Sequence, residues 1–142
     1  MRTTSLFLLL LLSLLALSCG EQEIIGVPPE TYTLQQNYPN PFTDNTRIIY
    51  GVPAVGEGNP APWIRLVVYD RFLQQQATLV NDPAHPAKTD TVLWNGRGVN
   101  GALVKPGLYY IELQRVLTSG ILTVGDSPDN ISVLLRITAL KK

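Results

Sequence analysis

Short runs of alternating apolar and polar residues, separated by turn-forming residues, most constrain the fold of this chain. The clearest run is 63–70, where Ile64, Leu66 and Val68 fall on one face of an extended strand. Outside the first 18 residues, no stretch longer than a turn or two has apolar residues at helical spacing. Together with eleven Gly and eleven Pro, this pattern predicts an all-β sandwich or barrel.

Six segments have the alternation and the flanking turn signals expected of strands. They are residues 46–52, 63–70, 74–80, 90–94, 108–113 and 131–140. Residues 118–130 are expected to form a long return loop or a weak seventh strand. In the closing strand, Val133, Leu135 and Ile137 are predicted to face the core. Six or seven strands in about 110 residues favour an immunoglobulin-like antiparallel β-sandwich.

The opening of this domain contains two prolines that limit its backbone pairing. The string is Asn37-Tyr38-Pro39-Asn40-Pro41-Phe42. Proline has no N–H to donate, so this piece is excluded from the centre of a sheet. It is predicted to lie along an edge, with Phe42 inserted into the core.

The N-terminus has the layout of a secretory signal peptide. Met1-Arg2 is followed by an apolar stretch from Leu6 to Leu17, which is shorter than the roughly 20 residues of a spanning helix. Ala16-Leu17-Ser18-Cys19 resembles the lipobox of bacterial lipoproteins. The resemblance implies cleavage before Cys19 and acylation of its thiol and new amine. The alternative is an ordinary signal peptide that a cysteine happens to follow.

These observations divide the chain into three parts. Residues 1–18 are the predicted signal peptide, 19–31 a lipidated tether, and 32–142 the β-sandwich domain. Fully extended, the tether could reach roughly 45 Å. We therefore expect an outer-membrane-anchored protein of the cell envelope, facing either the periplasm or the surface.

Charge and composition exclude several kinds of partner and chemistry. Without Arg2, ten basic side chains stand against eleven acidic ones, and no cluster of Lys or Arg suggests nucleic acid or an anionic membrane surface. One cysteine and one histidine leave little material for a Ser-His-Asp triad or a zinc site. We expect no catalytic residue, metal, cofactor or small-molecule substrate.

The remaining motifs have plain structural interpretations. Residues 96–101 fit G-x-G-x-x-G, but Pro106-Gly107 leaves no room for the helix that phosphate binding needs, so a hairpin is predicted. His85 is predicted to be a solvated loop residue. The aspartates lack EF-hand spacing and are interpreted as turn formers: Asp82, Asp90, Asp126 and Asp129.

Three aromatic residues form a possible contact group. Trp63, Tyr69 and Tyr110 are predicted to lie on an outer sheet face, where an aromatic platform could bind a protein or a glycan. The alternative is ordinary cross-strand packing.

Several segments together resemble a known family. They are residues 34–42, 46–53, 65–70, 77–80, 91–97 and 106–110, with Asn37-Tyr38-Pro39-Asn40-Pro41-Phe42 the most specific string. They are similar to C-terminal sorting domains of the type IX secretion system, whose fold relatives include immunoglobulin-like domains of flagellar hook-capping proteins. The resemblance covers about residues 32–142 and implies an immunoglobulin-like fold.

Three functions follow as expectations. Because only a tether precedes the domain, the leading one is a non-catalytic structural module that docks to another envelope or surface protein. The second is a sorting signal for type IX secretion. The third is a weak glycan-binding module.

Overall fold

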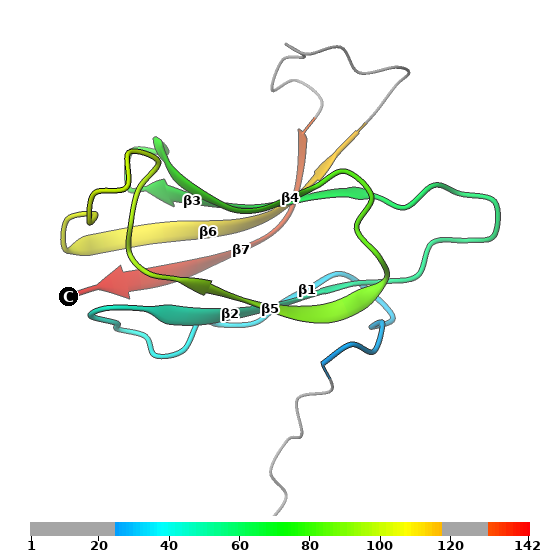
Figure 1. The fold of residues 1–142 in the computed structure, drawn as a ribbon, viewed down its shortest axis with the longest axis horizontal. Helices are drawn as coiled ribbons and strands as arrows, with labels where there is room; N and C mark the ends of the chain where they lie inside the picture. The colour runs from blue at the N-terminus through cyan, green and yellow to red at the C-terminus, as the bar shows by residue number, and fades with distance from the viewer. Residues whose placement is uncertain (1–24, 118–130) are drawn as a thin grey trace, which may run out of the picture.

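The described part of the chain forms a β-sandwich of seven strands (Figure 1). The computed structural model describes residues 25–117 and 131–142, and every regular element in those ranges is a strand. The strands are β1 (Thr33–Leu34), β2 (Thr46–Val52), β3 (Trp63–Asp70), β4 (Gln75–Asp82), β5 (Lys88–Trp94), β6 (Gly107–Val116) and β7 (Ile131–Lys141). The predicted fold class is confirmed.

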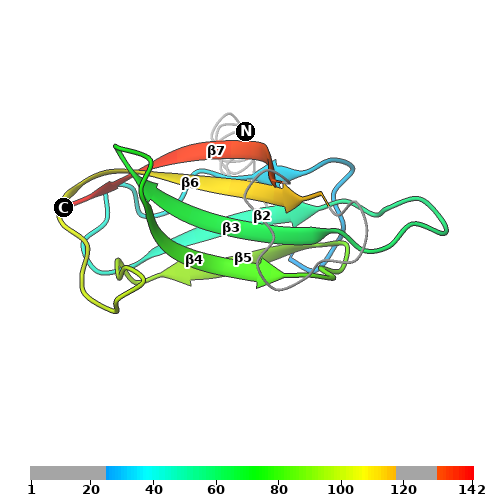
Figure 2. The same cartoon turned by 90° about the horizontal axis from the view of Figure 1, so that it is seen from above.

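The strands form two antiparallel sheets that face each other. One has the order β1-β2-β5 and the other the order β4-β3-β6-β7, and Figure 2 shows the four-stranded sheet with β7 and β4 at its two edges. In constant-type immunoglobulin domains the fourth strand joins the sheet of the first two. Here β4 pairs with β3 instead.

The core lies between the sheets and consists of the alternate residues that the sequence predicts. Ile64, Leu66 and Val68 of β3 are fully buried. Trp94 of β5 lies at the centre of an aromatic cluster, with its ring centroid 5.2 Å from that of Phe42 and 5.4 Å from that of Tyr109. The buried cluster comprises Phe42, Ile48, Tyr50, Val52, Ile64, Leu66, Val68, Ala77, Trp94, Tyr109, Ile111, Leu113 and Ala139.

The predicted core face of the closing strand is wrong over its first half. Val133 is 48% exposed and Leu135 is 36% exposed, whereas Leu134 packs against the core. A β-bulge between β6 and β7 explains the outward position of Val133, because Leu113 pairs with Leu135 while the next residue, Gln114, pairs with Val133. Leu135 lies before the bulge, opposite the buried Leu113, so the bulge does not account for its partial exposure. One inserted residue exchanges the faces of the strand beyond it. Ile137, on the other side of the bulge, packs against the core as predicted.

Two strands extend beyond their predicted bounds of 74–80 and 90–94. Residues 81–82 extend β4, and residues 88–89 extend β5. Both additions pair in register with a neighbour, Ile64 with Asp82 and Val52 with Lys88. Pairing with neighbouring strands therefore extends β4 and β5 into residues whose local composition did not indicate a strand. The return loop or weak strand predicted for residues 118–130 falls outside the described residues.

The proline-rich segment lies along a sheet edge, as predicted. The Phe42 N–H donates to the Leu140 carbonyl at 2.9 Å, and the Lys142 N–H donates to the Phe42 carbonyl at 2.8 Å. Asn40 Oδ1 accepts from the Leu140 N–H at 2.9 Å. The segment thus covers the outer edge of β7 while the Phe42 ring, 1% exposed, enters the core. The Tyr38-Pro39 and Asn40-Pro41 peptide bonds are both cis.

Residues 26–34 cross the outer face of the three-stranded sheet, and we call them the strap. At one end the Thr89 N–H of β5 donates to the Val27 carbonyl at 2.9 Å. At the other end β1 pairs with the opposite edge of β2. Between them, Pro29 lies so close to Gly51 of β2 that a Cβ there would be 2.7 Å from its Cγ. Position 51 therefore requires glycine, because Pro29 leaves no space for a Cβ atom there.

Tyr109 has the geometry of the tyrosine corner of immunoglobulin-like domains. It lies near the start of β6, and its buried hydroxyl donates to the Lys105 carbonyl, four residues upstream, at 2.6 Å. In that motif a tyrosine of the sixth strand ties the preceding loop to the sheet. The same contact here supports an immunoglobulin-like arrangement.

Candidate interaction surfaces

The structure brings together two of the three predicted contact residues. Tyr69 of β3 and Tyr110 of β6 are directly opposite each other on the outer face of the four-stranded sheet. Trp63 shares that face but is six residues away along β3, which is roughly 20 Å. Its indole N–H donates to Asn81 Oδ1 at 2.8 Å. Cys19, the predicted lipidation site, lies outside the described residues.

A polar network links Tyr69 to the far edge of the same face. Gln114 Nε2 donates to Tyr69 Oη at 3.0 Å and to Glu112 Oε2 at 2.8 Å. Arg136 Nε donates to Glu112 Oε1 at 2.7 Å, and its guanidinium carbon is 5.4 Å from the Tyr110 ring centroid. The buried Glu112 carboxylate is thereby paired, as burial of a charge requires.

Apolar side chains extend this face beside the tyrosines. Leu108 of β6 and Leu140 of β7 are opposite each other, and both are exposed. They flank the Tyr110 position on the same side of the sheet, because side chains on one face recur every second residue. We call Tyr69, Leu108, Tyr110 and Leu140 the outer-face patch.

His85 is buried, so the prediction of a solvated loop histidine is wrong. It is 2% exposed, with Nε2 3.0 Å from Tyr50 Oη and Nδ1 2.7 Å from the Pro86 carbonyl oxygen. Because a carbonyl only accepts, Nδ1 carries a hydrogen, and in the neutral ring Nε2 accepts from the Tyr50 hydroxyl. Burial raises the pKa of Tyr50, and nearby Asp90 raises it further, so this hydroxyl stays protonated and able to donate.

Asp90 lies at the start of the exposed edge of β5. Burial by itself would raise the pKa of its carboxyl, but hydrogen bonds from Lys88 and the Thr91 N–H lower it by more in sum. The Lys88 ammonium is 2.7 Å from Asp90 Oδ2, and the Thr91 N–H donates to Oδ1 at 2.8 Å. The Asp90 side chain thereby occupies one of the donors on the β5 edge.

Beyond Thr91 the β5 edge is open. The backbone groups of Thr89 point away from β2 and pair with the strap. Because these directions alternate along a strand, those of Leu93 point the same way. The Leu93 N–H and carbonyl have no partner within the described ranges. Its side chain is 64% exposed.

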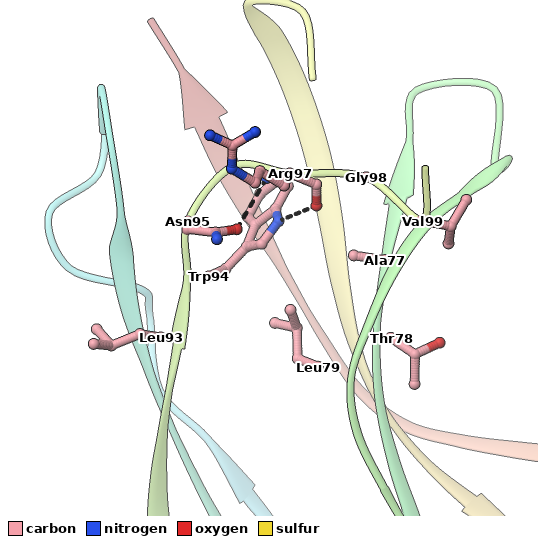
Figure 3. Close-up of a pocket in the computed structure, with 9 residues that line it drawn as sticks. All are labelled: Ala77, Thr78, Leu79, Leu93, Trp94, Asn95, Arg97, Gly98 and Val99. Atoms are coloured by element: carbon pink, nitrogen blue, oxygen red, sulfur yellow. Dashed lines mark hydrogen bonds between the residues drawn. The ribbon is translucent and has the colours of Figure 1, made fainter. Parts of the chain in front are cut away.

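A groove of about 530 Å³ lies between this edge and β4 (Figure 3). It is lined by residues 77–79, 93–95 and 97–99. Leu79 and Trp94 lie between the two strands, whereas the Leu93 side chain points to the other side of β5. Val99 and Leu103 in the following loop are 74% and 62% exposed. The groove is thus an opening with both apolar and polar lining residues, beside the unpaired backbone groups of Leu93.

The described residues contain neither a metal-binding cluster nor a membrane-spanning helix. Within residues 25–117 and 131–142, no three His, Cys, Asp or Glu side chains are grouped so that they could hold a metal ion. The same ranges contain no helix of the length and apolarity needed to cross a bilayer.

No protein-family model, curated protein or solved structure matches this chain.

Sequence reasoning missed the groove and the Tyr50–His85 pair. The groove depends on which strand of each sheet lies at its edge, which alternation alone does not indicate. The histidine is buried by a residue 35 positions away. The Glu112–Arg136 pair could have been found, because both residues occupy outward positions in adjacent predicted strands.

Proposed function

We propose that this chain is a lipid-anchored bacterial envelope protein whose β-sandwich is a non-catalytic docking module for another envelope protein. The observation that carries the docking role is the exposed stretch around the open β5 edge. Leu93, Val99 and Leu103 all expose more than half of their side chains there. Exposed apolar side chains near an open strand edge favour pairing of that edge with a partner strand.

The anchor half of the proposal depends on Cys19. Two acyl chains already hold a protein stably on a bilayer, and the lipobox resemblance implies three on this residue. A Cys19→Ala variant should move from the detergent phase to the aqueous phase on temperature-induced phase separation. A variant that stays in the detergent phase like the parent would refute the anchor.

The docking half can be tested by photo-crosslinking in intact cells. A photoreactive phenylalanine analogue is placed singly at Leu93 or Leu103 beside the open edge, and at Leu108 or Leu140 in the outer-face patch. The proposal predicts a discrete crosslink to one envelope protein from at least one surface. Absence of any protein crosslink from all four positions would contradict a docking module.

Type IX sorting is the alternative outcome. Surface protease treatment of cells with and without that secretion system distinguishes the two functions. Loss of surface exposure only in cells lacking the system would assign residues 32–142 a sorting role.

A further inference from the structure

The β5 edge and the groove beside it have the features of a site for one added strand. This inference deepens the proposed docking function and depends on it. The Leu93 N–H and carbonyl supply one donor and one acceptor that point away from β2. A strand placed antiparallel to β5 would exchange both bonds with Leu93 in a hydrogen-bonded pair. Its neighbouring side chains would then face Leu79 and Trp94 in the groove.

The charges at the groove end favour an acidic partner. Residues 71–74, 95–106 and 141–142 lie at this end of the sandwich, together with the start of β2 and the end of β3 (Figure 1). Six basic and two acidic side chains are found there: Arg47, Arg71, Arg97, Lys105, Lys141 and Lys142 against Asp44 and Asp70. The Asp70 carboxylate accepts three hydrogen bonds from its own turn and neighbouring residues. Among the groove residues, Arg97 is the single charged side chain.

The strap limits how far an added strand can extend. Val27 already pairs with Thr89 near the start of β5. The free edge of β5 therefore reaches no further toward the N-terminus than Thr91. The Thr91 N–H is in turn occupied by Asp90 Oδ1. An antiparallel segment therefore has room for about six residues, with its N-terminal end beside Arg97.

We propose that the β5 edge and the adjoining groove bind an extended segment of a partner protein, about six residues long and antiparallel to β5. The segment carries acidic residues at its N-terminal end, near Arg97, and alternating apolar residues after them. Backbone pairing with Leu93 gives affinity, and the apolar side chains in the groove give specificity.

The test uses the full chain, ¹⁵N-labelled in detergent micelles, and a capped synthetic peptide of sequence Asp-Glu-Val-Thr-Val-Thr. We expect saturable amide shift changes centred on residues 91–95 and 77–79. A peptide with Lys-Arg in place of Asp-Glu should bind at least about tenfold more weakly. No shift at millimolar peptide, or equal binding of the basic peptide, would overturn the proposal.

Two variants separate the groove from general charge attraction. Arg97→Glu should weaken the acidic peptide by about tenfold, whereas Lys105→Glu, which changes the same charge at the same end outside the groove, should have a much smaller effect. Equal losses in the two variants would refute a defined site. Leu93→Pro removes the edge donor without removing a bond to β2, and should abolish the residue 91–95 shifts.

Failure of the β5 groove proposal can be distinguished from failure of the docking function. Cellular crosslinks from Leu108 or Leu140 alone, with no peptide effect at Leu93, would leave the docking function standing and reject the β5 groove. A crosslink from Leu93 to a second copy of this chain would also reject the acidic-partner assignment.

Discussion

Substitution of Gly51 by alanine tests whether the strap is packed directly on the three-stranded sheet. The new Cβ would lie 2.5 Å from Thr33 Oγ1 and 2.7 Å from Pro29 Cγ, where ordinary contacts are 3.4–4 Å. The strap must therefore move outward by close to an ångström, and such overpacking costs typically about 1–3 kcal/mol. The smaller conformational entropy of unfolded alanine returns about 0.4–1 kcal/mol. We expect a net loss of about 1–2 kcal/mol.

The assay is urea unfolding of the full chain in mild detergent, followed by tryptophan fluorescence. Gly56→Ala is the matched control, because its nearest neighbour is the flexible Asn59 side chain, and it should change stability by less than about 0.5 kcal/mol. Pro29→Ala removes the ring atoms that the new Cβ would meet. The double variant should therefore recover about 1 kcal/mol relative to additivity. Additive losses, or a Gly51→Ala variant as stable as the parent, would refute the close approach.

Three other predictions concern the core, the tyrosine corner and pH. Phe42→Ala should destabilise the domain by about 3–5 kcal/mol, because its ring is buried against Trp94, and a urea midpoint unchanged by the substitution would contradict its role in the core. Tyr109→Phe should cost about 1–2 kcal/mol by leaving the Lys105 carbonyl without its donor, measured as a lower Tm, whereas a neutral effect would show that water replaces the hydroxyl. The lowered pKa of Asp90 means that its carboxylate stabilises the fold fully above the unfolded pKa and loses this effect as pH falls through the folded pKa. Asp90→Asn should therefore be less stable than the parent at pH 7 by under about 1 kcal/mol, with a difference that disappears near pH 2; a constant difference at both pH values would exclude the charge as its cause.

The fold was predictable because most strands here have one buried face and one outward face. In β3 the alternation of Ile64, Leu66 and Val68 fixes which side is core, and a one-residue shift would expose all three. The bulge opposite Leu113 was not predictable in this way, since an extra residue in β7 leaves its local composition unchanged. The outward position of Val133 results from that insertion.

The contact residues were only partly predictable. Trp63 and Tyr69 lie on one face of β3 because they are an even number of residues apart, but the length of strand between them keeps their side chains apart. Only the pairing register of β3 with β6 shows that Tyr69 lies opposite Tyr110. The burial of His85 depends on Tyr50 of a distant strand. Local sequence, with proline on one side and alanine on the other, resembled an ordinary exposed loop.

The position of the open edge was the least accessible to sequence reasoning. It follows from where the strap ends on β5, which is set by backbone pairing between Val27 and Thr89. Pairing of this kind between a coil segment and a strand leaves no periodic signal in either segment.

The mass of the N-terminal peptide of the protein purified from membranes tests directly whether lipid on Cys19 holds the proposed docking module at a membrane. We expect this peptide to begin at Cys19 and to carry a diacylglycerol thioether and an acylated amine. A peptide that retains residues 1–18, or that begins at an unmodified Cys19, would contradict this expectation.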